Sequence, residues 1–110
     1  MKTLKFRSQL ADLVLQGKKT KTWRIFDEKN LSVGDKVQLI RWETGEPFGE
    51  AIIEKVVEKK MGQLTSKDKE GHEKFSSDGQ MYKTYSKYYG KPITKDTLVK
   101  VILLNGILKR

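Results

Sequence analysis

Two long runs of residues that favour β-strands constrain the fold of this chain more than any other feature. Residues 48–57 are rich in isoleucine and valine, and a second run of this kind lies within residues 96–107. β-Branched side chains pack well on a pleated sheet. Strands of this length have to bend to enclose a core in a chain of 110 residues. We therefore expect an α+β protein whose sheet curls into a small β-barrel.

The N-terminal part of the sequence predicts a short strand followed by a short helix. Residues 3–6 alternate polar and apolar side chains, as a half-buried strand does. Ser8 offers a hydroxyl oxygen that can cap a helix. The apolar residues that follow have the spacing of one helix face: Leu10, Leu13 and Val14. Gly17 supplies the left-handed residue that commonly ends a helix, so the chain leaves this helix at a defined corner.

Residues 20–26 predict a second strand with two different faces. Side chains alternate along a strand, so Thr20, Thr22 and Arg24 share one polar face, while Trp23 points to the opposite, partly apolar face. Turn residues at 32–35 and 44–47 bracket a third strand at 36–42. This third strand and the run at 48–57 therefore form a predicted hairpin.

The second half of the chain predicts an irregular stretch and then a second principal helix. For residues 62–77 we expect a loop with one helical turn near 66–70 and apolar contacts from Leu64 and Phe75. Ser77 or Asp78 can cap the helix that follows, and Gly90 ends it. With the final strand at 96–107, the predicted order is β-α-β-β-β-loop-α-β, within one domain that comprises residues 1–110.

The charge of the chain favours a polyanionic partner. Lysine and arginine number 23 against 14 acidic residues, which gives a formal net charge of +9 at pH 7. A field of this size in a small body attracts nucleic acids and nucleotides. The alternative is that the lysines only keep the protein soluble, and composition alone does not choose between the two.

The sequence lacks features that several kinds of functional site and several cellular locations require. Without cysteine the chain has no disulfide framework, thiol nucleophile or thiolate zinc site, so we expect neither a metal nor another cofactor. Residues 1–7 alternate charged and apolar side chains instead of forming the apolar run of a signal peptide. No stretch approaches the roughly 20 apolar residues of a membrane span. We expect a cytoplasmic protein without membrane contact, and a monomer is the favoured oligomeric state.

The segment at residues 18–24 is the best candidate for a reactive or binding site. It holds four cations, Lys18, Lys19, Lys21 and Arg24, together with the hydroxyl of Thr22. Neighbouring positive charges disfavour protonation of a lysine, so one lysine is able to act as a base toward Thr22, while Arg24 holds an anionic or carbonyl oxygen. The alternative is a solvated basic strand edge that deters strand pairing.

In its motifs the chain resembles the ASCH family of the PUA-like superfamily. The segment Gly-Lys-Lys-Thr-Lys-Thr-Trp-Arg at 17–24 follows a short amphipathic helix, and Val-Gly-Asp at 33–35 precedes a strand. The similarity continues through Glu-Gly-His at 70–72 and the tyrosine-rich second helix, so it covers nearly the whole chain. The resemblance implies a PUA-like mixed β-barrel with two principal helices and a cleft that faces residues 17–24.

One subgroup of small single-domain ASCH proteins is similar enough to imply hydrolysis of N4-acetylcytidine to cytidine and acetate. In that subgroup a lysine, a threonine and a glutamate form the proposed catalytic triad. The matching residues here are Lys19, Thr22 and Glu70, with Glu73 as an alternative for the acidic member. His72 is either a proton carrier beside Glu70 or an ordinary polar loop residue.

A further group of residues is predicted to contact a nucleoside substrate or RNA. These candidate binding residues are Lys18, Lys21, Arg24, His72 and Tyr89. Tyrosines at 82–89 repeat at helical spacing, so most are expected to pack against the core, with one at the rim of the cleft. We interpret Trp23 as a core residue, with base stacking as the alternative. The alternative function is a noncatalytic module that binds RNA or a modified base in the same basic cleft; ribonuclease activity has little support, because the chain has one histidine.

Overall fold

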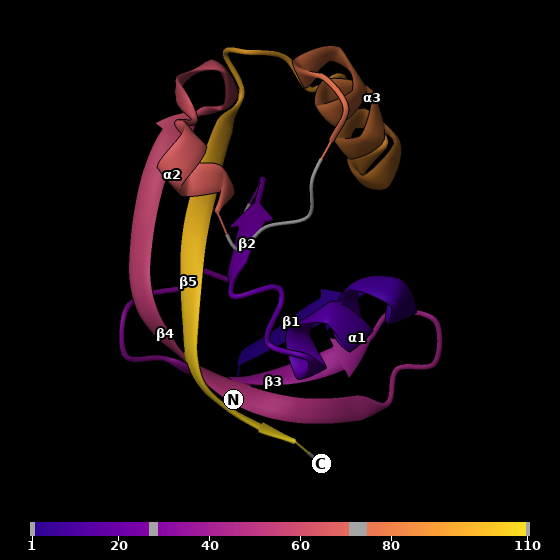
Figure 1. Ribbon diagram of the computed structural model, residues 1–110, viewed down its shortest axis with the longest axis vertical. Coiled ribbons are helices and arrows are strands. Elements are labelled where there is room, and N and C mark those ends of the chain that lie inside the picture. The colour runs from indigo at the N-terminus through magenta and orange to yellow at the C-terminus, as the bar shows by residue number, and fades with distance from the viewer. Residues whose placement is uncertain (1, 27–28, 71–74, 110) are drawn as a thin grey trace.

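The computed structural model describes residues 2–26, 29–70 and 75–109. Its strands form a single mixed sheet, and helices connect some of them (Figure 1). The strands, in chain order, are β1 (Lys2–Phe6), β2 (Lys21–Arg24), β3 (Lys36–Arg41), β4 (Pro47–Lys60) and β5 (Leu98–Lys109). The helices are α1 (Ser8–Leu15), α2 (Ser66–Lys69) and α3 (Asp78–Tyr89), with one 3₁₀ turn, η1 (Met61–Gln63).

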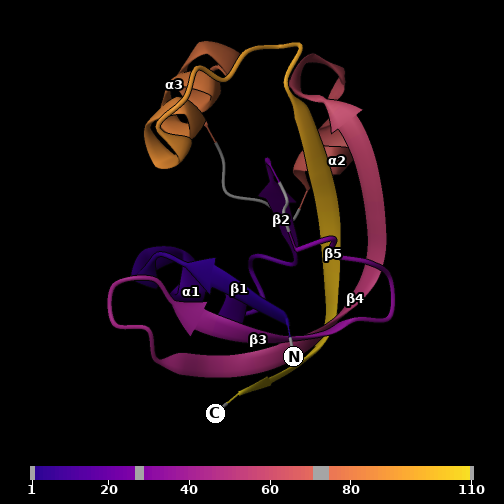
Figure 2. The ribbon, with the colours of Figure 1, turned by 180° about the vertical axis from the view of Figure 1, so that it is seen from behind.

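The sheet has the strand order β1-β3-β4-β5-β2, so β1 and β2 are its two edges. β1 pairs with β3 in parallel, and the other three strand pairs are antiparallel. The long strands β4 and β5 curve strongly and carry the sheet around in a half-barrel (Figures 1 and 2). Register shifts between β4 and β5 help this curvature, since bulges bend a strand and increase its twist. The expected α+β fold with a curled mixed sheet is confirmed, and the sheet stays open between β1 and β2.

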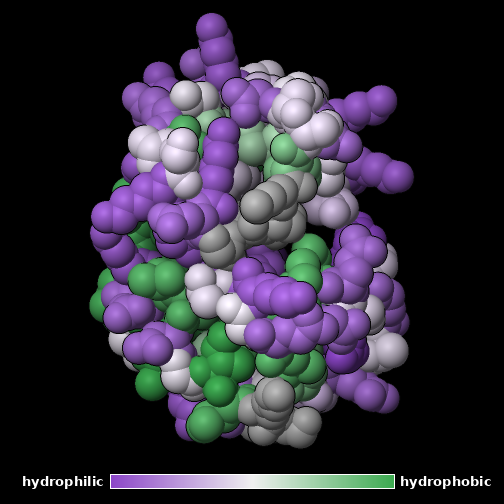
Figure 3. Space-filling model, in the orientation of Figure 1, coloured by the Kyte–Doolittle hydropathy of each residue, from purple (hydrophilic) through white to green (hydrophobic). Residues whose placement is uncertain are grey.

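Two apolar clusters fill the molecule. The first lies inside the curl of the sheet and includes Phe6, Val14 and Leu39, which come from β1, α1 and β3. The second lies where β2 and the N-terminal part of β5 meet α3, and it includes Trp23 and Tyr85. Leu64 and Phe75 pack against this second cluster, as expected. On the face shown in Figure 3, hydrophilic side chains predominate, with apolar patches between them.

The ends of the two main helices follow the predicted stop signals, but one start signal was interpreted wrongly. Ser8 does not cap α1, because its N–H and hydroxyl groups both donate to the carboxylate of Glu43, at 3.0 and 3.1 Å. α3 begins as expected, with the hydroxyl oxygen of Ser77 accepting from the N–H of Gln80 at 3.1 Å. Gly17 and Gly90 have φ angles of +75° and +65°, the left-handed conformation that glycine adopts without strain.

Three further predictions can be compared with the structure. The hairpin of β3 and β4 is present, and the helical turn expected near 66–70 is α2. The strand predicted at 20–26 is shorter, because β2 ends at Arg24 and Phe26 adopts a φ angle of +56°. This backbone turns the chain away from the sheet and leaves the ring of Phe26 half exposed.

Candidate functional site

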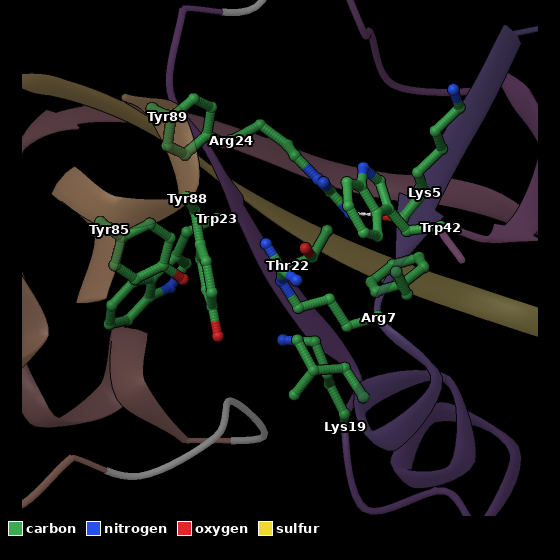
Figure 4. A pocket seen from close by; sticks show the side chains of 12 residues that line it. Lys5, Arg7, Lys19, Thr22, Trp23, Arg24, Trp42, Tyr85, Tyr88 and Tyr89 are labelled. Atoms are coloured by element: carbon green, nitrogen blue, oxygen red, sulfur yellow. Dashed lines mark hydrogen bonds between the residues drawn. The ribbon is translucent and has the colours of Figure 1, made fainter. Parts of the chain in front are cut away.

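A cavity of about 230 Å³ lies at the opening of the sheet, between the edge strands β1 and β2, which do not pair with each other. Its wall is built from the end of β1, the start of α1, β2, one side of α3 and one residue after β3 (Figure 4). The polar residues of this wall are Lys5, Arg7, Lys19, Thr22 and Arg24. The aromatic side chains that line it include Trp23, Trp42, Tyr85, Tyr88 and Tyr89.

Lys19 and Thr22, two of the predicted catalytic residues, both line this cavity. The backbone N–H of Lys19 donates to the carbonyl oxygen of Leu13, so the turn at Gly17 brings Lys19 back against α1. Lys19 is 2% exposed and Thr22 is 3% exposed. The Nζ of Lys19 donates to the carbonyl oxygen of Lys21 at 3.0 Å. A buried amine and a buried hydroxyl therefore share one small space, which is unusual because burying polar groups is costly.

Arg24 lines the same cavity but is held by the strand across the gap. One Nη donates to the carbonyl oxygen of Lys5 on β1 at 3.0 Å. Its guanidinium carbon lies 4.8 Å from the centre of the Phe6 ring. The side chain therefore links the two edges of the sheet where no backbone hydrogen bonds join them.

Trp23 is a core residue, as interpreted from the sequence, but it also reaches the cavity. It is 2% exposed and stacks on Tyr85 with 5.9 Å between ring centres. Tyr85 in turn stacks on Tyr89, whose hydroxyl oxygen accepts the N–H of Ile25 at 3.1 Å. The prediction that Trp23 points away from the site was wrong in part, because residues from both faces of β2 line the cavity together with residues of α3.

Arg7 and Trp42 are site residues that the sequence interpretation missed. The guanidinium carbon of Arg7 lies 4.7 Å from the ring centre of Trp42 and 4.6 Å from that of Tyr88. Arg7 follows β1 and Trp42 follows β3, and the N–H of Trp42 donates to the carbonyl oxygen of Phe6 at 2.8 Å. The parallel pairing of β1 with β3 brings these residues together, and no local motif indicates that pairing.

The other predicted site residues lie elsewhere or outside the described residues. Lys18 is exposed, and the Nζ of Lys21 donates to the carbonyl oxygen of Lys67 on α2, so neither lines the cavity. Glu70 is exposed where α2 ends and is not among the described residues that line the cavity. His72 and the alternative acid Glu73 lie outside the described residues.

The described wall of the cavity carries four cations and no carboxylate. Such a site favours a ligand with carbonyl or anionic oxygens, and its aromatic side chains favour a planar ring. Within residues 2–26, 29–70 and 75–109 there is no group of three histidine, cysteine or acidic side chains able to hold a metal ion. The described helices include none that is long and apolar enough to span a membrane.

Solved structures share this architecture over nearly the whole chain. An ASCH domain from Lactobacillus crispatus superposes with a TM-score of 0.72, and the match covers 99% of this chain and 81% of that one, at 14% identity. The chain has the fold of the ASCH domains. An ASCH protein from Zymomonas mobilis gives a TM-score of 0.67 at 16% identity, with 94% of this chain and 66% of that chain covered.

A protein of Enterococcus faecalis shares the ASCH fold of this chain at a TM-score of 0.69 and 18% identity, with 92% of this chain and 71% of that chain covered. No protein-family model matches the sequence, and no curated protein matches it significantly. The likeness is therefore one of three-dimensional structure. It identifies the ASCH fold and leaves activity to be argued from the cavity.

Proposed function

We propose that the cavity is the active site of an amidohydrolase that removes the acetyl group from N4-acetylcytidine. The observation that carries the proposal is the burial of Lys19 and Thr22 in one aromatic-walled cavity. A lysine kept from solvent beside a hydroxyl is a pair suited to nucleophilic attack on a carbonyl carbon. The sequence resemblance to the N4-acetylcytidine amidohydrolases supports the choice of substrate.

In the proposed reaction Thr22 is the nucleophile and the neutral amine of Lys19 is the base. The Oγ of Thr22 forms a bond to the acetyl carbon as its proton passes to Lys19. The bond from that carbon to N4 of cytosine then breaks, and N4 takes a proton, so cytidine leaves. Water hydrolyses the acetyl ester on Thr22 to acetate and restores the hydroxyl.

An acidic residue would relay the proton to the leaving amine or orient Lys19. The resemblance assigns this role to Glu70, with Glu73 as the alternative. Comparison of Glu70→Gln and Glu73→Gln in the same assay identifies the acid, since only loss of the acting carboxylate removes the proton relay.

The size of the cavity favours a small substrate. Its volume of about 230 Å³ is below the roughly 300–1,000 Å³ of sites for drug-sized ligands. The stacked rings of Trp23 and Tyr85, together with Tyr88, form a wall suited to a planar base. A single modified nucleoside therefore fits the described wall better than an extended strand of RNA does.

The test is release of cytidine from N4-acetylcytidine by the purified protein, followed by chromatography. We expect turnover by the wild type and a loss of at least about 100-fold in Lys19→Met, because positioned general bases contribute that much. Lys83→Met, which changes an exposed lysine on α3, is the matched control and should keep full activity. Absence of turnover by the folded wild type would overturn the proposal.

The alternative function is a noncatalytic module that binds RNA or a modified base in the same cavity. The formal net charge of +9 favours it, since cations that contact phosphates increase affinity for nucleic acid. A wild type that releases no cytidine but binds RNA with a steep salt dependence would support this module. Binding by a catalytically active protein would instead point to acetylated cytidine within RNA as a substrate.

A further inference from the structure

We propose that Arg7, and not Arg24, binds the acetyl oxygen of the substrate and stabilises the negative charge that develops on it. This inference rests on the proposed amidohydrolase function and assigns its oxyanion-binding residue. The sequence pattern points to Arg24, which shares a strand face with Thr22. The tertiary structure brings a second guanidinium to the same cavity, from a part of the chain that the motif does not include.

The guanidinium of Arg7 is held between two aromatic rings. Its central carbon lies 4.7 Å from the ring centre of Trp42 and 4.6 Å from that of Tyr88. Cation–π contacts on two sides restrict this long side chain and retain its positive charge. Contacts through π faces also use none of its N–H donors, which lie in the guanidinium plane. Arg7 is therefore positioned by its neighbours and still able to donate to a ligand.

Arg7 shares the cavity with the two proposed catalytic side chains. In Figure 4 its guanidinium lies between Tyr88 and Trp42, on the side of Thr22. A carbonyl carbon attacked by the Oγ of Thr22 would place its oxygen within this part of the cavity. Donors that already face the position of the developing oxyanion lower the barrier most, since they need little rearrangement during the reaction.

Arg24 is poorly suited to this role because it already has another one. Its Nη donates to the carbonyl oxygen of Lys5 at 3.0 Å, and its guanidinium lies over Phe6. Turning toward a substrate would break the link between β1 and β2 and leave the carbonyl of Lys5 without this donor. The side chain would thus exchange an existing charge-assisted hydrogen bond for the one to the substrate.

No described carboxylate forms an ion pair with Arg7, so none competes with a substrate for its N–H groups. Glu43 is the nearby acid, and its carboxylate accepts from the N–H and hydroxyl groups of Ser8. Those hydrogen bonds, with a smaller contribution from the charge of Arg7, lower the pKa of Glu43. Glu43 thus stays ionised and holds the start of α1, while the N–H groups of Arg7 remain available on the cavity side.

The role of Arg7 can be written as one balanced step. The Oγ of Thr22 forms a bond to the acetyl carbon, the π electrons of the carbonyl bond move onto oxygen, and the proton of Thr22 moves to Lys19. Arg7 donates hydrogen bonds to that oxygen and stays protonated throughout. When the carbon–N4 bond breaks, the electron pair returns to re-form the carbonyl group, and N4 takes the proton.

The first test measures binding without turnover. In a Thr22→Val background, which lacks the nucleophile, isothermal titration calorimetry compares N4-acetylcytidine with cytidine. We expect the acetylated nucleoside to bind about 10-fold more tightly, as a charge-assisted hydrogen bond allows. Adding Arg7→Met should remove this preference, and Arg7→Lys should keep only part of it. Arg41→Met, whose side chain pairs with Asp12 outside the cavity, is the matched control.

The second test uses the active protein and separates kcat from KM. We expect Arg7→Met to lower kcat for N4-acetylcytidine by about 100-fold or more, as loss of an oxyanion donor does, with a smaller change in KM. Arg41→Met should keep the wild-type kcat. Circular dichroism and thermal unfolding establish that each variant is folded.

The outcomes distinguish this inference from the proposed function. An active wild type whose kcat is unaffected by Arg7→Met would overturn the role of Arg7 and leave the amidohydrolase intact. An inactive wild type, with a preference for the acetyl group that depends on Arg7, would overturn the catalytic function and retain Arg7 as the residue that binds the acyl oxygen. Equal affinity for the two nucleosides in the Thr22→Val background would overturn the inference.

Discussion

The guanidinium of Arg24 on β2 donates a hydrogen bond to the carbonyl oxygen of Lys5 on β1, with 3.0 Å between the two atoms. These strands are the two edges of the sheet and do not pair through their backbones. The contact therefore spans the opening at which the candidate site lies. It assigns a structural role to the arginine that the sequence motif associates with the substrate.

Loss of this link should loosen the open edge of the sheet. We expect Arg24→Met to lower the free energy of unfolding by about 1–2 kcal/mol, because the variant loses a charge-assisted hydrogen bond to Lys5. Urea denaturation measures this change. Lys36→Met, which removes an exposed cation 3.9 Å from Glu50, is the control and should cost less than about 1 kcal/mol. Equal effects of the two substitutions would show that the link does not hold the edge.

Gly49 should be the glycine of β4 that tolerates no side chain. A Cβ atom at this position would lie 2.6 Å from the carbonyl oxygen of Leu108 on β5, which cannot move without disturbing the sheet. We expect Gly49→Ala to lower the free energy of unfolding by about 2 kcal/mol or more. Chemical denaturation tests this expectation.

Gly79 on α3 provides the matched control for Gly49. A Cβ atom there has only the hydroxyl oxygen of Ser77 nearby, at an ordinary distance of 3.8 Å. Gly79→Ala should leave stability unchanged or raise it by up to about 1 kcal/mol, since alanine favours helices more than glycine does. If Gly49→Ala were as stable as Gly79→Ala, the close approach of β5 to β4 would not be rigid.

Asp68 should make folding sensitive to acid. Burial raises its pKa, but hydrogen bonds from Lys59 and Thr65 outweigh this effect, so the pKa of Asp68 is lowered from its usual value. The Nζ of Lys59 lies 2.6 Å from its Oδ2. A depressed pKa in the folded state stabilises the protein above the unfolded pKa of about 3.9, and this contribution is lost as the pH falls through the folded value.

The measurement is the free energy of unfolding as a function of pH. We expect Asp68→Asn to lower stability near neutral pH by about 1 kcal/mol and to lose less stability than the wild type on acidification. Asp96→Asn, at an exposed turn before β5, is the control and should keep the wild-type slope. An unchanged slope in Asp68→Asn would contradict the linkage between Asp68 and folding.

Much of the fold could be predicted from local sequence signals. The β-rich run at 48–57 forms most of β4, and Gly17 and Gly90 end helices where their left-handed backbone is required. Ser77 caps α3 as its position indicates. Such signals are reliable because they report the preferences of neighbouring residues. The capping role of Ser8 was wrong because its partner, Glu43, lies 35 positions along the chain.

The candidate site was only partly visible in the sequence. The basic segment contains Lys19 and Thr22, which line one cavity because both belong to a single turn and strand. Lys18 and Lys21 belong to the same segment, yet they lie outside that cavity. Charge and spacing identify the segment, but they do not determine which of its lysines becomes buried.

The sequence by itself determined the types of element, the positions of the glycine turns, the net positive charge and the basic segment. Only the tertiary structure decided that Arg7, Trp42 and Tyr88 meet at the cavity and that Arg24 links the sheet edges. Local preferences act within a few residues, whereas these contacts depend on the parallel pairing of β1 with β3 and on the packing of α3 against β2. The arginine nearest to Thr22 in sequence is therefore held by β1, while Arg7 reaches the same cavity from a distant part of the chain.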